Sequence, residues 1–155
     1  MREPQRLRTS ILLVLVVLCA AACTSRDSRT GLVRRYIDEL LVQQHWQLWG
    51  EFMSENPRYN GVAAGHDAFR AVAHFLNTTF SELSVTIEDQ LVDRAWVVTR
   101  VTVRGIQTGP FLNVPPRNRP VRFRAILMDR MEGGRVVEMW HEFAYWDALL
   151  QVAQR

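Results

Sequence analysis

Apolar residues recur every three or four positions in the first half of the chain and every second position in the second half. The helical spacing begins near Thr30 and predicts an amphipathic helix with one apolar face. That face consists of Leu32, Val33, Tyr36, Ile37, Leu40 and Leu41. A second short helix is predicted over 44–53, and Asn56-Pro57 is expected to end it before a loop over 57–65.

A third helix is predicted to begin at Gly65. Its apolar face consists of Phe69, Val72, Ala73, Leu76 and Phe80. Alternating patterns then predict strands over 83–88, 96–104, 121–131 and 136–146, with Glu132-Gly133-Gly134 as a hairpin turn and 147–154 as a closing helical turn. Helices followed by antiparallel strands indicate an α+β fold, in which a curved sheet wraps around helices and leaves a pocket between them.

The N-terminal segment has the features of a bacterial export signal. Residues 1–10 are polar and contain three Arg, residues 11–18 are continuously apolar, and residues 19–23 are small. The apolar run of 11–23 is too short for a transmembrane helix, which needs about 20 residues. We therefore predict a signal peptide over 1–22.

The sequence Ala20-Ala21-Ala22-Cys23 resembles the bacterial lipobox, in which small residues precede a Cys that receives a diacylglycerol. Cys23 would then be the lipidated residue, followed by a polar tether to residue 30 and a single domain over 31–155. Acyl chains supply the membrane affinity of such an anchor. We expect a lipid-anchored protein of the cell membrane or envelope, outside the cytoplasm. The alternative is an ordinary signal, cleaved near Ala22 and leaving Cys23 unmodified.

Charge and composition exclude several functions. Removal of Arg2, Arg6, Arg8 and Glu3 with the signal lowers the formal net charge from +3 to near neutral, so no nucleic-acid partner is expected. All 19 basic residues are Arg, which excludes lysine Schiff-base chemistry. With one Cys after the signal and no His pair at i, i+4 spacing, we expect no metal site and no cofactor.

Four segments, in order, resemble the SnoaL-like polyketide cyclases of the nuclear transport factor 2-like superfamily. They are Gly109–Arg119, which reads GPFLNVPPRNR, with Phe80–Asp89 before it and 121–126 and 134–140 after it. The resemblance extends over 32–151. It implies a cone-shaped α+β barrel with an apolar pocket, often dimeric. It also implies either ligand binding or acid–base enzymes such as cyclases, isomerases, dehydratases and hydrolases.

The resemblance assigns the family's acid–base Asp to His141, its neighbouring His to Leu127, and the His of its GTHTG stretch to Gln107. His141 is therefore the candidate catalytic residue, because an imidazole titrates near neutral pH. The other interpretation is a structural, hydrogen-bonded histidine. Strand periodicity groups His141 with Met139, Phe143 and Tyr145 on one face.

Residue type and strand or helix spacing indicate further candidates for a ligand site. The residues expected to line an apolar ligand pocket, or otherwise to fill the core, are Trp46, Trp49, Tyr59, Phe69, Phe75, Leu127, Met139 and Phe143. Arg100 and Arg124 are interpreted as ligand-carboxylate binders or as solvated strand residues. Asp129, next to Arg130, is interpreted as part of a surface ion pair.

Two functions follow from these patterns. The first is an exported lipoprotein that binds a small apolar ligand. The alternative is a cyclase-like or isomerase-type enzyme that uses His141 as acid or base on a carbonyl compound, without a metal. A dimerisation or scaffold role through the open sheet face is a third interpretation, so a homodimer stays open as a partner.

Overall fold

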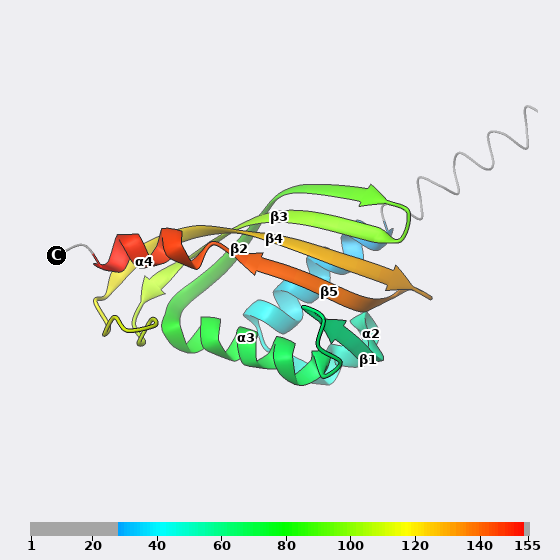
Figure 1. Cartoon of the computed structure of the whole chain (residues 1–155), viewed down its shortest axis with the longest axis horizontal. Helices are drawn as coiled ribbons and strands as arrows, with labels where there is room; N and C mark the ends of the chain where they lie inside the picture. The colour runs from blue at the N-terminus through cyan, green and yellow to red at the C-terminus, as the bar shows by residue number, and fades with distance from the viewer. Residues whose placement is uncertain (1–27, 154–155) are drawn as a thin grey trace, which may run out of the picture.

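The N-terminal part of the domain is helical. The computed structural model describes residues 28–153 (Figure 1). Residues 28–36 form an α-helix that continues as the π-helical η1 (Ile37–Val42). The short η2 (Trp46–Leu48) and α2 (Trp49–Phe52) follow. The predicted apolar face is the buried one, since Val33, Tyr36 and Leu40 are inaccessible to solvent.

A five-stranded sheet forms the rest of the domain. Its strands are β1 (Met53–Tyr59), β2 (Phe80–Asp93), β3 (Trp96–Gln107), β4 (Arg119–Glu132) and β5 (Arg135–Phe143), in the spatial order β1-β5-β4-β3-β2. Neighbouring strands are antiparallel, except that β1 runs parallel to β5. Gly133 and Gly134, both with positive φ, form the predicted turn between β4 and β5.

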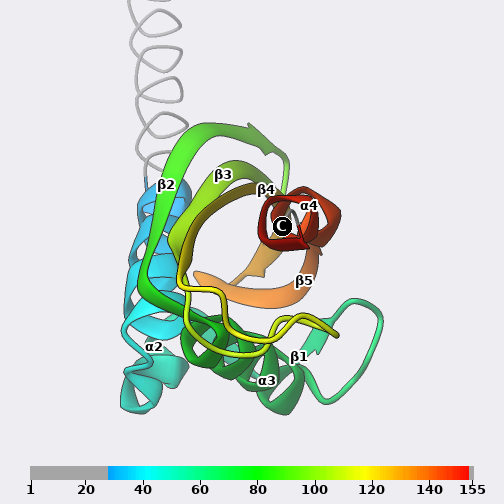
Figure 2. The same cartoon turned by 90° about the vertical axis from the view of Figure 1, so that its left-hand side faces the viewer.

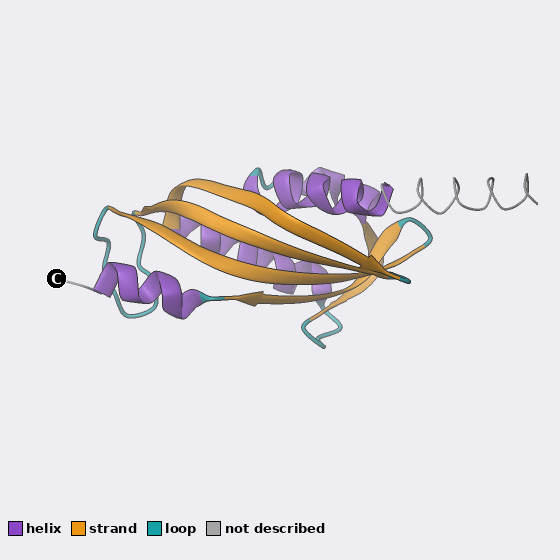
Figure 3. Ribbon diagram, turned by 90° about the horizontal axis from the view of Figure 1, so that it is seen from above, coloured by secondary structure: helices purple, strands orange, loops and turns teal. Residues whose placement is uncertain are grey.

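Helices cover one face of the curved sheet, which we call the inner face (Figures 2 and 3). The helix α3 (Gly65–Thr79) contacts β1, β2 and η1, while α4 (Tyr145–Ala153) packs against β4. Burial alternates strictly along most of β4, so Leu127 points to the inner face and Ile126 to the outer one. The core between the helices and the inner face is rich in aromatic rings.

One predicted loop is wrong: residues 53–59 form the strand β1 instead of a helix end and a loop. Only Met53, Arg58 and Tyr59 have partners on β5, and the register shifts between Met53 and Arg58. Pro57 is tolerated because β1 is an edge strand, where a missing N–H breaks no ladder bond. A strand this irregular has no alternating pattern to reveal it in the sequence.

The signal peptide, Cys23 and the start of the tether lie outside the described residues. Within 28–153, no helix is long and apolar enough to cross a membrane. The predicted α+β architecture is confirmed, with helices on a mostly antiparallel sheet.

Candidate functional site

A buried polar cluster joins the first helix to the inner face of the sheet. The Tyr36 hydroxyl donates a hydrogen bond of 2.6 Å to Oδ2 of Asp129. Nε2 of His141 lies 3.0 Å from Oδ1 of Asp129 and 3.5 Å from the Tyr36 hydroxyl oxygen. Tyr36 and Asp129 are completely buried and His141 is 3% exposed. We call these three residues the Tyr–Asp–His cluster.

The interpretation of Asp129 as a surface residue is wrong. Asp129 shares the inner face with Leu127 and Met131, whereas Arg130 points outward and pairs with Glu138 and Glu132. The alternation of apolar and polar residues along β4 already indicates that Asp129 faces the core, because it is the only acidic residue at the apolar positions of that strand. A buried carboxylate requires hydrogen-bond partners, and Tyr36 and His141 supply them.

Asn60 fixes the backbone of His141. Its Nδ2 donates to the His141 carbonyl oxygen at 3.1 Å, and the His141 N–H donates to its Oδ1 at 2.8 Å. The backbone N–H of Asn60 also donates to the carbonyl oxygen of Met139 at 2.8 Å. Asn60 has φ +46°, a conformation that Asn tolerates better than most residues. The Asn60 side chain thus extends the β1–β5 pairing up to the candidate catalytic residue.

The two ring nitrogens of His141 differ in their surroundings. Nε2 of His141 faces Oδ1 of Asp129, and in the neutral imidazole that donates to this carboxylate through Nε2–H, Nδ1 holds the lone pair. Nδ1 is buried and has no hydrogen-bond partner within residues 28–153. Burial, followed by the charge of Asp129, raises the pKa of Tyr36 well above its usual value, so Tyr36 stays a donor.

Aromatic rings surround the cluster, with Phe69 of α3 at their centre. The centroid of Phe69 lies 6.0 Å from that of His141 and 6.1 Å from that of Tyr36. On its other sides, Phe69 contacts Trp46 at 6.3 Å and Trp49 at 5.9 Å. Both Trp residues are half-buried, so Phe69 separates the Tyr–Asp–His cluster from the rings that reach solvent.

The residues predicted to line a pocket occupy three parts of the structure. Tyr59, Phe69, Leu127 and Met139 are buried in the core around His141, and Trp46 and Trp49 lie at its margin. Phe75 and Phe143 belong to a second aromatic group, centred on Tyr145. The role of all eight as ligand contacts stays a prediction.

Gln107, one of the positions assigned from the family, has a structural role. Its Nε2 donates to the carbonyl oxygens of Gly109 at 2.8 Å and Pro115 at 3.0 Å, and its Oε1 accepts from the Arg117 N–H at 2.9 Å. It therefore fastens the 108–118 loop to β3. Leu127, the other assigned position, lies directly opposite His141 in the β4–β5 register.

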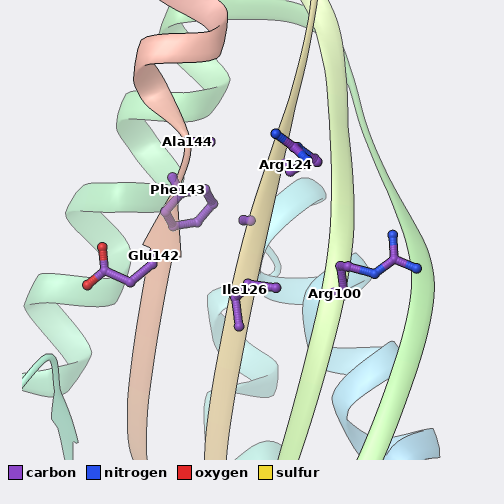
Figure 4. Close-up of a pocket in the computed structure, with 7 residues that line it drawn as sticks. Arg100, Arg124, Ile126, Glu142, Phe143 and Ala144 are labelled. Atoms are coloured by element: carbon purple, nitrogen blue, oxygen red, sulfur yellow. The ribbon is translucent and has the colours of Figure 1, made fainter.

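Arg100 and Arg124 lie away from this cluster, on the outer face of the sheet. They line a shallow groove of about 360 Å³ with Ile126, Glu142 and Phe143 (Figure 4). Arg124 forms an exposed ion pair of 3.2 Å with Asp147 of α4. The inner cluster and the outer groove are therefore separate candidate sites. No group of three potential metal ligands occurs among residues 28–153.

The SnoaL-like polyketide cyclase family matches residues 31–152. Solved structures with a similar fold include TsrD from Streptomyces laurentii, which is 23% identical with a TM-score of 0.72 over 82% of this chain and 96% of that one. A protein from Jannaschia described as a SnoaL-like polyketide cyclase is 24% identical with a TM-score of 0.68, over 83% and 94% of the two chains.

IdmH from Streptomyces antibioticus, described as a polyketide cyclase, is 21% identical with a TM-score of 0.69, over 83% of this chain and 98% of that one. At these identities the likeness concerns the fold. No curated protein matches this chain.

Proposed function

Because the chain belongs to the SnoaL-like polyketide cyclase family, we propose that it is a cyclase-like or isomerase-type enzyme that removes a proton next to a carbonyl group. His141 is the base. The observation that carries the proposal is the asymmetry of its imidazole. One nitrogen contacts Asp129, and the other is buried and has no hydrogen-bond partner within residues 28–153. A general base oriented by a carboxylate has this arrangement.

The proposed step transfers one proton. Nδ1 of His141 takes the proton from the carbon next to the carbonyl, and the electron pair of that C–H bond forms a carbon–carbon double bond. The carbonyl oxygen then carries the negative charge of an enolate. Attack of the enolate carbon on a second carbonyl of the substrate closes a ring, and return of the proton to the new oxygen regenerates His141. Where the substrate carries a carbon–carbon double bond conjugated with the enolate, return of the proton to the far carbon of that dienolate gives an isomer instead.

Asp129 and Tyr36 act through His141 as positioning residues. The Asp129 carboxylate holds the ring through Nε2 and stabilises the imidazolium that forms during proton transfer. The Tyr36 hydroxyl donates a hydrogen bond to the second oxygen of that carboxylate, and this bond holds the carboxylate in one orientation. The burial of all three groups strengthens their electrostatic interactions.

The surroundings of His141 favour an apolar substrate. Phe69 and Tyr59 contact its ring edge-on, and Phe69 in turn contacts the half-buried rings of Trp46 and Trp49. Lining of this kind binds hydrocarbon or aromatic groups and excludes charged ones. We propose that the substrate enters between the two Trp residues and displaces the Phe69 ring.

The proposed reaction is tested by hydrogen–deuterium exchange. The protein without residues 1–22 is incubated with 2-tetralone in D₂O, and loss of its α-proton signals is followed by NMR. We expect the wild-type protein to accelerate exchange and His141→Gln to abolish the acceleration. His74→Gln, on the exposed side of α3, is the matched control and should retain it.

Equal exchange in wild type and His141→Gln overturns the assignment of the base. Binding of 2-tetralone without any accelerated exchange favours the other function, a lipoprotein that binds a small apolar ligand without turnover.

A further inference from the structure

Two tyrosine hydroxyls have no hydrogen-bond partner in the part of the chain that the structure describes. Of the three tyrosines, only Tyr36 uses its hydroxyl in a hydrogen bond within residues 28–153. Tyr59 is 6% exposed and Tyr145 is half-buried, yet neither hydroxyl has a partner in that part of the chain. Neither hydroxyl oxygen is among the fully buried unpaired atoms of this part of the chain, so each retains contact with solvent and is able to donate to a bound molecule.

Tyr59 lies directly beside the proposed base. It is the last residue of β1 and pairs with Met139 of β5, two residues before His141. The ring centroids of Tyr59 and His141 are 5.2 Å apart with an angle of 79° between the rings. Asn60, which fixes the His141 backbone, follows Tyr59 in the chain, so one turn holds both side chains in position.

Tyr145 lies next to Phe143, which follows His141 by two positions on β5 and so shares a face of that strand with it. Tyr145 begins α4 and stacks on Phe143 at 5.4 Å, with only 11° between the rings. Burial raises the pKa of Tyr59 most, and Tyr145 is the next cause, ahead of Asp129 and Glu142. Burial also raises the pKa of Tyr145 to about 12. Both groups therefore remain protonated donors at neutral pH.

We propose that Tyr59 is a second catalytic residue, which donates a hydrogen bond to the carbonyl oxygen of the substrate, with Tyr145 as an auxiliary donor. This inference rests on the proposed function, because the oxygen becomes negative only when His141 removes the neighbouring proton. A donor aimed at developing charge in a dry site lowers the barrier more than it strengthens ground-state binding. The Tyr36 hydroxyl cannot donate to the substrate oxygen in this way, because its hydrogen already bonds to Asp129.

The first test uses 2-naphthol as a probe, because its oxygen and planar rings mimic an enolate. Binding is measured by calorimetry for the wild type, Tyr59→Phe, Tyr145→Phe and Thr86→Val. We expect the loss of the Tyr59 hydroxyl to weaken binding about tenfold, the range of one hydrogen bond to a partly charged oxygen. A smaller loss is expected for Tyr145→Phe. Thr86→Val, on the outer face, should bind as the wild type does.

The second readout separates a catalytic donor from a structural hydroxyl. Tyr59→Phe should unfold at about the same urea concentration as the wild type, because the hydroxyl that it removes has no hydrogen-bond partner within residues 28–153 and is not fully buried. In the 2-tetralone exchange assay, it should lower kcat about tenfold or more with little change in KM.

Either of two results overturns the inference: 2-naphthol fails to bind the wild type, or Tyr59→Phe binds it equally well. If His141→Gln retains exchange while Tyr59→Phe loses naphthol affinity, the proposed base fails and the donor stands. If exchange depends on His141 and naphthol affinity does not depend on Tyr59, the base stands and the donor fails.

Discussion

His141 and Asp129 contact each other diagonally across two strands. The register pairs Asp129 with Met139 and Leu127 with His141, yet Nε2 of His141 reaches Oδ1 of Asp129 at 3.0 Å. Neighbouring positions on one face of a sheet allow such diagonal contacts between long side chains. This contact converts an isolated histidine of the sequence into an oriented imidazole.

The first prediction concerns the hydrogen bond between Tyr36 and Asp129. Tyr36→Phe should lower the free energy of unfolding by about 1.5–3 kcal/mol, because it removes a donor to a buried carboxylate. Urea denaturation followed by circular dichroism measures the change. Tyr145→Phe, whose hydroxyl has no partner in residues 28–153, is the control and should cost much less. Equal losses in the two variants contradict the assigned contact.

A second prediction concerns Asn60, whose side chain holds the His141 backbone. Asn60→Ala should cost about 2 kcal/mol for its two hydrogen bonds, and a further 1–2 kcal/mol because Ala is strained at positive φ. Asn118→Ala is the control that measures the backbone strain alone. Asn118 has φ +53°, and its side chain forms no hydrogen bond in the described part of the chain. If both variants lose the same stability, the Asn60 side-chain bonds contribute nothing.

Phe69 provides the third prediction. Phe69→Ala should destabilise the domain by about 3–5 kcal/mol, because it leaves a cavity among four other rings and His141. An apolar cavity of this kind stays dry and binds small hydrocarbons. Benzene should therefore raise the melting temperature of Phe69→Ala and leave that of the wild type unchanged. A variant that does not respond to benzene has collapsed around the site.

The fourth prediction is a loss of stability at alkaline pH. Burial raises the pKa of Tyr145 to about 12, whereas an unfolded tyrosine titrates near 10. The unfolded chain therefore binds fewer protons than the folded one between these values, and stability falls as pH rises through this range. Tyr145→Phe should make the decline of the free energy of unfolding shallower between pH 9.5 and 11.5. An unchanged slope would place the Tyr145 titration near its ordinary value.

A fifth prediction concerns the anchor expected at Cys23. The full chain, expressed in a bacterium that processes lipoproteins, should incorporate labelled palmitate and fractionate with membranes. Cys23→Ala should abolish labelling and release the protein in soluble form, because the acyl chains supply the membrane affinity. Cys19→Ala, inside the predicted signal, is the control. Labelling that survives Cys23→Ala contradicts the predicted modification site.

The sequence alone was sufficient for the class of fold and most of its elements. Amphipathic spacing identified the buried face of the first helix and of α3, and alternation identified β2 to β5 and the turn at Gly133 and Gly134. These features depend on local periodicity, which each segment carries by itself. The same periodicity correctly grouped His141 with Met139 on the buried face of β5.

The partners of His141 depended on tertiary structure. Tyr36 belongs to an apolar helical stripe and Asp129 stands beside an arginine, so neither residue's immediate neighbours reveal the contact. They meet His141 only because the first helix crosses the inner face and β4 pairs with β5 in one particular register. A hydrogen bond between residues 93 positions apart follows from chain packing and not from any local pattern, which is why the sequence singled out His141 as a candidate without indicating its neighbours.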